Sequence, residues 1–247
     1  MPPPRAHRRL DRLAPTIARL TVGDSPAAWT RLGFKVRGDL CQVGTVALEL
    51  VGDAASGGIV RWALRDSPTA ELDGLPTDLI DAGPGAAERH PNGALAIDHI
   101  VVMSPSLDRT AAALDDAGVR LRRVRDAGPP DAPIRQGFFR LGEVILEVVA
   151  PRETDDRDTG TSQSRAQADA SATWPPRPGP SDPASFWGLV FVVADLQRCA
   201  DLLGEHLGQA RDAVQPGRRI ATLRRSAGVS VPVAFITPAP ARVPTPS

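Results

Sequence analysis

The chain has 247 residues, 42% hydrophobic and 23% charged, which predicts one large or two small folded domains rather than a disordered chain. Lys and Arg total 29 and Asp and Glu also total 29, so no net charge favours nucleic acid or an anionic membrane surface as a partner. No apolar run approaches the roughly 18 residues of a membrane-spanning helix. The two cysteines, Cys41 and Cys199, lie far apart and predict no disulfide framework. We expect a cytoplasmic protein of bacterial-type composition, without nucleic-acid or membrane partners.

The first segment with regular patterning spans residues 14–66 and follows an expected flexible tail at 1–13. Its alternating and apolar runs, with a Ser-Pro helix start, predict a reduced strand–helix–strand unit. The expected elements are, in order, a strand at 17–22, a helix that begins at Ser25 and Pro26 and ends at Gly33, strands within 41–51, and a strand at 58–65. We interpret residues 67–94 as an irregular connector.

The second segment, residues 95–151, shows the clearest order of elements. A β-branched run predicts a buried strand, and Ser106 then offers an N-cap to a helix with apolar residues at helical spacing. Two further strands join at Gly142. The expected elements are a strand at 96–103, a helix at 107–117, and strands at 136–141 and 143–150.

The third segment, residues 185–240, repeats this order. Asp195 is its expected helix cap and Gly208 its expected helix stop. The expected strands are 186–193, 219–224 and 231–237. Residues 152–184, which are rich in Asp, Ser and Pro, are interpreted as a disordered linker, and 241–247 as a tail. In addition, residues 41–51 align with 139–149 without a gap, so three related units are predicted.

A tandem strand–helix–three-strand (βαβββ) unit resembles the vicinal oxygen chelate superfamily, which includes glyoxalase I, extradiol dioxygenases and bleomycin-resistance proteins. The closest motif match is Asp98-His99-Ile100 in the first strand of the middle unit and Leu146-Glu147-Val148 in its last strand. The resemblance implies an α+β fold in which two units form an eight-stranded, glyoxalase-like cup around a small-molecule site. The 14–66 segment would then be an additional, reduced N-terminal unit.

The same resemblance implies a metal role for His99 and Glu147, and a catalytic proton-transfer role for Glu147. An imidazole and a carboxylate suit one divalent transition metal such as Zn, Ni, Fe or Mn. A catalytic site needs further protein ligands. Alignment of the last unit places Gly188 at the position of His99 and Ala234 at that of Glu147, and neither side chain can bind a metal. The chain therefore holds an incomplete metal site, and absence of any cofactor is the alternative.

Other interpretations of these residues stay open at this point. A buried carboxylate needs a partner, which for Glu147 is a metal, His99 or an arginine. In the first unit Glu49 matches Glu147, the histidine position falls near Ala18, and we expect Glu49 to meet Arg19 or Arg61.

Substrate-binding candidates follow from strand alternation and from arginine placement. Gln136 and Phe138 share a strand face and are expected to line the cup together with Phe191. Arginines at a cup mouth suit capture of a carboxylate or phosphate, although solvated strand ends are the favoured explanation in a chain this rich in arginine. Those selected as substrate-binding candidates are Arg140, Arg219 and Arg224.

Three functions are consistent with these patterns. The first is a metal-dependent lyase, isomerase or dioxygenase, and the second is a metal-free protein that binds or sequesters a drug or metabolite. The third is a scaffold. For the architecture, we expect the middle and last units to close one cup. The alternative pairs the first unit with the middle one and leaves the last unit to complete a dimer, so the protein is expected to be a monomer or a homodimer.

Overall fold

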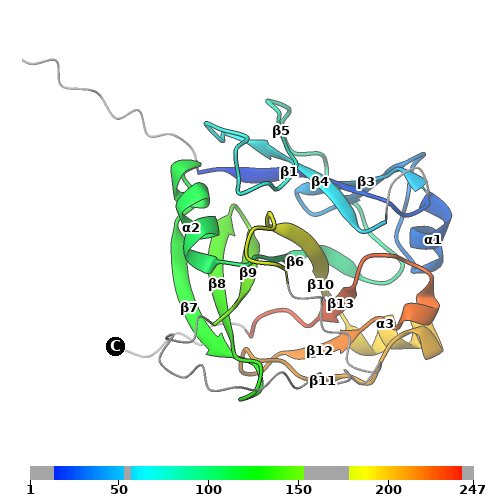
Figure 1. The fold of residues 1–247 in the computed structure, drawn as a ribbon. Helices are drawn as coiled ribbons and strands as arrows, with labels where there is room; N and C mark the ends of the chain where they lie inside the picture. Colours follow the sequence, from blue (N-terminus) through cyan, green and yellow to red (C-terminus); the bar gives the residue numbers. More distant parts are fainter. Residues whose placement is uncertain (1–13, 53–56, 153–177, 241–247) are drawn as a thin grey trace, which may run out of the picture.

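The computed structural model describes residues 14–52, 57–152 and 178–240 (Figure 1). The predicted tails and most of the predicted linker lie outside these residues. The described chain forms a five-stranded and an eight-stranded sheet with three α-helices. None of the helices in the described ranges is long and apolar enough to cross a membrane.

The eight-stranded sheet contains the middle and last units. Its strand order is β11-β12-β13-β10-β6-β9-β8-β7, and β6 pairs with β10 in antiparallel register at its centre. The two units therefore share one sheet, as in the predicted tandem βαβββ cup. The elements of the middle unit are β6 (Ala94–Met103), α2 (Leu107–Asp116), β7 (Leu121–Ala127), β8 (Ile134–Leu141) and β9 (Val144–Pro151). Those of the last unit are β10 (Ser185–Val193), α3 (Leu196–Leu203), β11 (Arg211–Asp212), β12 (Arg219–Thr222) and β13 (Val233–Ile236).

The five-stranded sheet is a reduced copy of the larger one. Strand β1 is parallel to β3 and antiparallel to β4, just as β6 is parallel to β9 and antiparallel to β10. The strand order is β2-β3-β1-β4-β5. The elements are β1 (Thr16–Val22), α1 (Pro26–Arg31), β2 (Leu40–Val43), β3 (Val46–Leu50), β4 (Ile59–Arg65) and β5 (Thr77–Leu79). Strand β5 lies in the stretch predicted as an irregular connector, which corrects that prediction.

The predicted helix starts are confirmed by their capping bonds. Ser25 accepts a hydrogen bond from the Ala28 amide, Ser106 from the Arg109 amide, and Asp195 from two amides of α3. Helix α3 ends at Gly204 rather than near Gly208, because the chain tightens there into a single 3₁₀ turn. Strand β7 has no sequence signal, since it is an exposed, arginine-rich edge strand without apolar alternation.

Strand alternation gives the large sheet two different faces. On one face Ile100, Leu146 and Phe191 join a single core with the helices and the N-terminal sheet. An aromatic cluster connects the units within this core: the Phe34 and Phe191 ring centroids lie 5.0 Å apart, and those of Trp29 and Phe191 lie 6.0 Å apart. The N-terminal unit therefore covers the convex face of the cup, and the concave face lies on the side away from it.

Phe191 is fully buried between the units, so its truncation should destabilise the protein rather than alter a pocket. We expect Phe191→Ala to lower the free energy of unfolding by about 3–5 kcal/mol in urea denaturation. Leu202→Ala, at an exposed position on α3, is the control and should cost less than about 1 kcal/mol. If Phe191→Ala lowered the free energy of unfolding by less than about 1 kcal/mol, the aromatic cluster would not connect the units as described.

Candidate functional site

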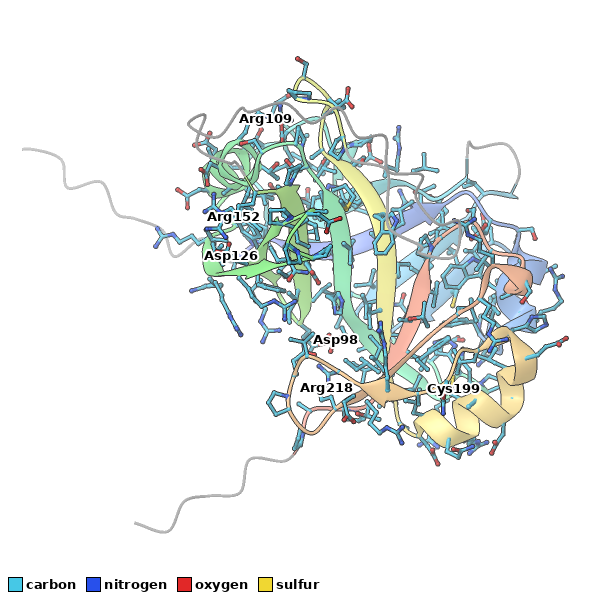
Figure 2. All side chains as sticks on the ribbon, turned by 60° about the horizontal axis from the view of Figure 1, so that its bottom comes forward. Asp98, Arg109, Asp126, Arg152, Cys199 and Arg218 are labelled. Carbon is cyan, nitrogen blue, oxygen red and sulfur yellow. The ribbon has the colours of Figure 1, made fainter. Side chains whose placement is uncertain are left out.

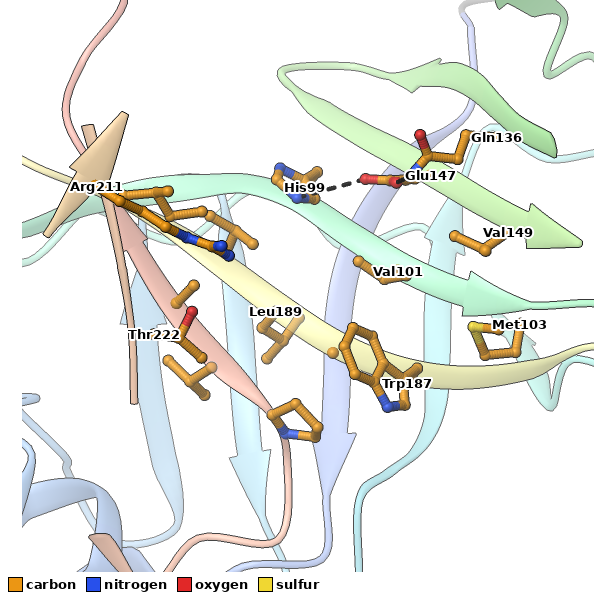
Figure 3. Close-up of a pocket in the computed structure, with 16 residues that line it drawn as sticks. His99, Val101, Met103, Gln136, Glu147, Val149, Trp187, Leu189, Arg211 and Thr222 are labelled. Atoms are coloured by element: carbon orange, nitrogen blue, oxygen red, sulfur yellow. Dashed lines mark hydrogen bonds and ion pairs between the residues drawn. The ribbon is translucent and has the colours of Figure 1, made fainter. Parts of the chain in front are cut away.

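The concave face of the eight-stranded sheet holds a cavity of about 220 Å³ (Figure 3). Most of its lining is aliphatic or aromatic, with a few polar side chains on opposite sides. The apolar lining comprises Val101, Met103, Val149, Trp187, Leu189, Val190, Ile220, Pro232, Val233 and Ala234, with the backbone of Gly188. The polar lining comprises His99, Gln136, Glu147, Arg211 and Thr222. We call His99, Gln136 and Glu147 the polar wall.

A β-bulge positions the first member of the polar wall. In the β6–β10 pairing, Val190 opposes His99 and Phe191 opposes Ile97, so Asp98 is an extra residue without a partner. A bulge of this kind breaks the strict alternation of side chains. Asp98 can therefore reach its neighbour, and its Oδ2 lies 2.8 Å from His99 Nδ1.

The polar wall belongs to a continuous chain of buried contacts between the two units. Arg218 Nη2 donates to Asp98 Oδ1 at 2.6 Å, and Figure 2 shows these two side chains next to each other. On the other side of the imidazole, His99 Nε2 lies 3.6 Å from Glu147 Oε2. Gln136 Nε2 donates to Glu147 Oε1 at 2.5 Å, and Arg125 donates to Gln136 Oε1. The hydrogen bonds to Asp98 and Gln136 orient the imidazole and the carboxyl group.

The two carboxyl groups that flank His99 differ in acidity. Burial raises the pKa of Glu147, and this effect exceeds the opposing influence of the charges on His99 and Arg125 and of the Gln136 hydrogen bond. Burial alone would also raise the pKa of Asp98, but hydrogen bonds from His99 and Arg218 outweigh it and lower the pKa. Asp98 is therefore a fixed anion beside Arg218, whereas Glu147 takes up a proton more readily than an exposed glutamate.

The strand registers test whether the cup can hold a metal ion. Val101 opposes Glu147 between β6 and β9, and Val190 opposes Ala234 between β10 and β13. Ala234 thus occupies the place of Glu147 in the other half, as the alignment predicted. The described residues contain no group of three or more His, Cys, Asp or Glu side chains that could bind one ion. Two converging donors do not make a catalytic metal site, which needs three or four protein ligands. The donor set therefore does not fit a resident metal.

The N-terminal sheet has an ion pair at the corresponding place. Thr21 opposes Glu49 and Arg19 opposes Ala47, so Arg19, the neighbour of the predicted Ala18, corresponds to His99. The stretch from Thr21 to the Ser25 cap is one residue shorter than that from Val101 to the Ser106 cap, which accounts for the difference. Arg19 Nε lies 3.5 Å from Glu49 Oε2, which is one of the two partners expected for Glu49. The other, Arg61, pairs with Asp78 instead.

Only part of the predicted substrate-binding set lies at the cavity. Gln136 lines it, whereas Phe138 lies in register with Glu147 beneath the Arg125 guanidinium, outside the lining. Phe191 is a clear correction, because it points to the convex face and into the aromatic cluster.

The predicted arginines also lie outside the lining. Arg140 donates to the Glu143 carbonyl, Arg219 to the Ala210 carbonyl, and Arg224 is exposed near the 3₁₀ turn that follows β12. These three arginines lie at solvated strand ends, which was the alternative interpretation of their positions.

The polar contributors that were not selected from the sequence include Asp98, Arg125 and Arg211. The position of Asp98 depends on a β-bulge, and that of Arg125 on an edge strand without apolar alternation. Neither feature has a recognisable pattern in the local sequence. Arg211 comes from a two-residue strand in a stretch that is otherwise polar. The motif Asp98-His99 was the one available signal, since adjacent carboxylate and imidazole groups invite such a pair.

His90 and the two cysteines lie away from the cavity lining and are held by contacts within the fold. His90 accepts a hydrogen bond from the Lys35 amide at Nδ1, and its Nε2 lies 2.9 Å from the Gln42 carbonyl oxygen. It is thereby held within the N-terminal unit. Burial raises the pKa of both Cys41 and Cys199 to about 12, so neither thiol forms a reactive thiolate near neutral pH.

Comparison with solved structures identifies the fold. A mutant of 4-hydroxymandelate synthase from Streptomyces coelicolor matches with a TM-score of 0.58 and 14% identity, covering 92% of this chain and 94% of that one. A fusion of a xylose isomerase-like TIM barrel with 4-hydroxyphenylpyruvate dioxygenase matches with a TM-score of 0.53 and 14% identity, covering 93% of this chain and 49% of that one. Methylmalonyl-CoA epimerase from Mycobacterium tuberculosis matches with a TM-score of 0.40 and 18% identity, covering 60% of this chain and 91% of that one.

No protein-family profile and no curated protein sequence matches the chain. The first two structural matches cover more than nine tenths of this chain and confirm the predicted α+β fold of tandem βαβββ units. At this level of identity they establish the fold alone.

Because the pKa of Glu147 is raised in the folded protein, the stability of the fold should depend on pH through this residue. A carboxyl group whose pKa is higher in the folded state favours folding below its ordinary value of 4.5, and this contribution is lost as the pH rises. Glu147→Gln removes the buried charge and keeps the hydrogen bond with Gln136, so its melting temperature should exceed that of the wild type at pH 7.5. At pH 4 the difference should disappear. Glu143→Gln, an exposed change on the same hairpin, should show no such pH dependence.

Proposed function

We propose that the cup binds a small, mainly apolar organic molecule without a resident metal ion. The observation that carries this proposal is the composition of the cavity: an aliphatic and aromatic lining with one polar wall whose members are already bonded to one another. Small-molecule sites typically combine an apolar surface with a few oriented polar groups. Each Å² of apolar ligand surface buried there contributes about 25 cal/mol.

The polar wall supports binding because it is ordered before a ligand arrives. His99 lies between Asp98 and Glu147, and Gln136 lies between Glu147 and Arg125. A ligand that hydrogen bonds to Glu147 or His99 therefore meets side chains that lose little conformational freedom.

A divalent-metal-dependent lyase, isomerase or dioxygenase is the competing function. One observation favours it: the Asp98 carboxylate contacts Nδ1 of His99, an arrangement that also orients histidines which bind metals through Nε2. The positions of the missing ligands, Gly188 and Ala234, oppose it. A metal would have to bind through His99 and Glu147 alone.

Two measurements separate these functions. Elemental analysis of protein purified without chelator should find well below one equivalent of Zn, Ni, Fe or Mn in both the wild type and the His99→Ala/Glu147→Ala double variant. One equivalent in the wild type that is lost in the double variant would make the metal-dependent enzyme the better account.

The second measurement is the binding of N-phenyl-1-naphthylamine, a neutral probe whose fluorescence rises in apolar sites. The wild type should bind it saturably and equally well with and without EDTA. Thr222→Trp places a large side chain in the cavity and should weaken binding at least tenfold, whereas Thr30→Trp, an exposed change on α1, should not. Absence of saturable binding by the folded wild type would contradict the proposed function.

A further inference from the structure

We infer that the ligand of the cup is an organic anion whose carboxylate group is bound by Arg211. This inference rests on the proposed function and adds the chemical class of the ligand. It begins with the position of Arg211 on the short edge strand β11, which pairs with β12 so that Arg211 opposes Ile220. Figure 3 shows the Arg211 side chain extending from the strand into the cavity, with its guanidinium facing the apolar lining.

Arg211 is the arginine that lines the cavity, and its side chain has no protein acceptor among the described residues. Arg218 binds Asp98 and the Thr237 carbonyl, and Arg125 binds Gln136. Arg219 binds a backbone carbonyl. For Arg211, the described part of the chain provides neither a hydrogen bond nor an ion pair. Its five guanidinium donors are therefore available to a molecule in the cavity.

The charge balance within the cavity also favours an anion. Glu147 is the sole carboxylate in the lining, and it faces His99 and Gln136 on the polar wall rather than Arg211. Asp98, on the other side of the imidazole, is neutralised by Arg218. Arg211 is therefore not paired with a carboxylate of the lining. It is exposed on its edge strand, and the apolar walls beside it strengthen its attraction for an anion that enters the cavity.

The shape and lining limit the class of anion. Guanidinium binds the planar carboxylate group through two parallel hydrogen bonds. Inorganic phosphate alone would leave the apolar surface around Trp187 and Met103 uncovered. A volume of about 220 Å³ accommodates a ring system or a branched aliphatic body next to the charged group. We therefore assign an aromatic or branched aliphatic carboxylate.

The test uses two probes that differ only in charge at the group expected to meet Arg211: 1-naphthoate and 1-naphthamide, titrated by calorimetry. The wild type should bind the naphthoate at least tenfold more tightly. Arg211→Gln should reduce naphthoate affinity about tenfold and leave naphthamide affinity unchanged, and Arg211→Lys should retain part of the preference. Arg122→Gln is the matched control, because Arg122 lies exposed on the opposite edge strand β7 and does not line the cavity.

Each other outcome overturns one of the two proposals. Equal binding of both probes by the wild type, with Arg211→Gln unchanged and Thr222→Trp impaired, would refute the anion assignment and preserve the proposed function. Naphthoate binding that persists in Thr222→Trp would place it outside the cavity and refute the assignment. If neither probe binds the folded wild type, the proposed function itself fails.

Discussion

The antiparallel pairing of β6 with β10 is the contact on which the rest of the molecule depends. It joins two units that could not each close a sheet, and it gives the joined sheet a convex face for the core and a concave face for the cavity. A slip of β10 by one residue in this register would turn its side chains to the opposite faces and move Phe191 out of the core into the cup. The aromatic cluster around Phe191 opposes such a slip, because it anchors β10 to the N-terminal unit.

The two halves of the cup share a backbone plan but not a chemistry. The middle unit supplies the polar wall, and the equivalent positions of the last unit are glycine and alanine. With ligands missing from one half, the His99–Glu147 pair is bonded to protein partners rather than completed as an ion-binding site. The last unit contributes apolar surface, Arg218 to hold Asp98, and Arg211 at the edge. This asymmetry produces a cavity with a hydrogen-bonding wall on one side and a positive charge on the other.

Local rules were sufficient to predict the repeated units and their helix caps, because capping and strand alternation depend on near neighbours in sequence. The pairing of His99 with Glu147 followed instead from the family resemblance. Local rules failed where a position depended on the assembled sheet. The apolar run around Phe191 is buried on both sides, so its alternation does not indicate which face meets the core. Asp98 reaches His99 only through a bulge defined by the opposing strand, and Arg211 reaches the cavity only because β11 pairs at the sheet edge. Long arginine side chains in particular are placed by tertiary structure, which explains why three predicted arginines lie elsewhere.

The central claim is that this cup holds an organic anion and no resident metal ion. A crystal structure of the protein grown with both 1-naphthoate and zinc, with anomalous data at the zinc edge, tests it most directly. We expect the naphthalene rings against Trp187 and the carboxylate on the Arg211 guanidinium, with no anomalous peak between His99 and Glu147. A zinc peak bonded to both side chains, with the naphthoate chelated to the zinc, would refute the metal-free anion site.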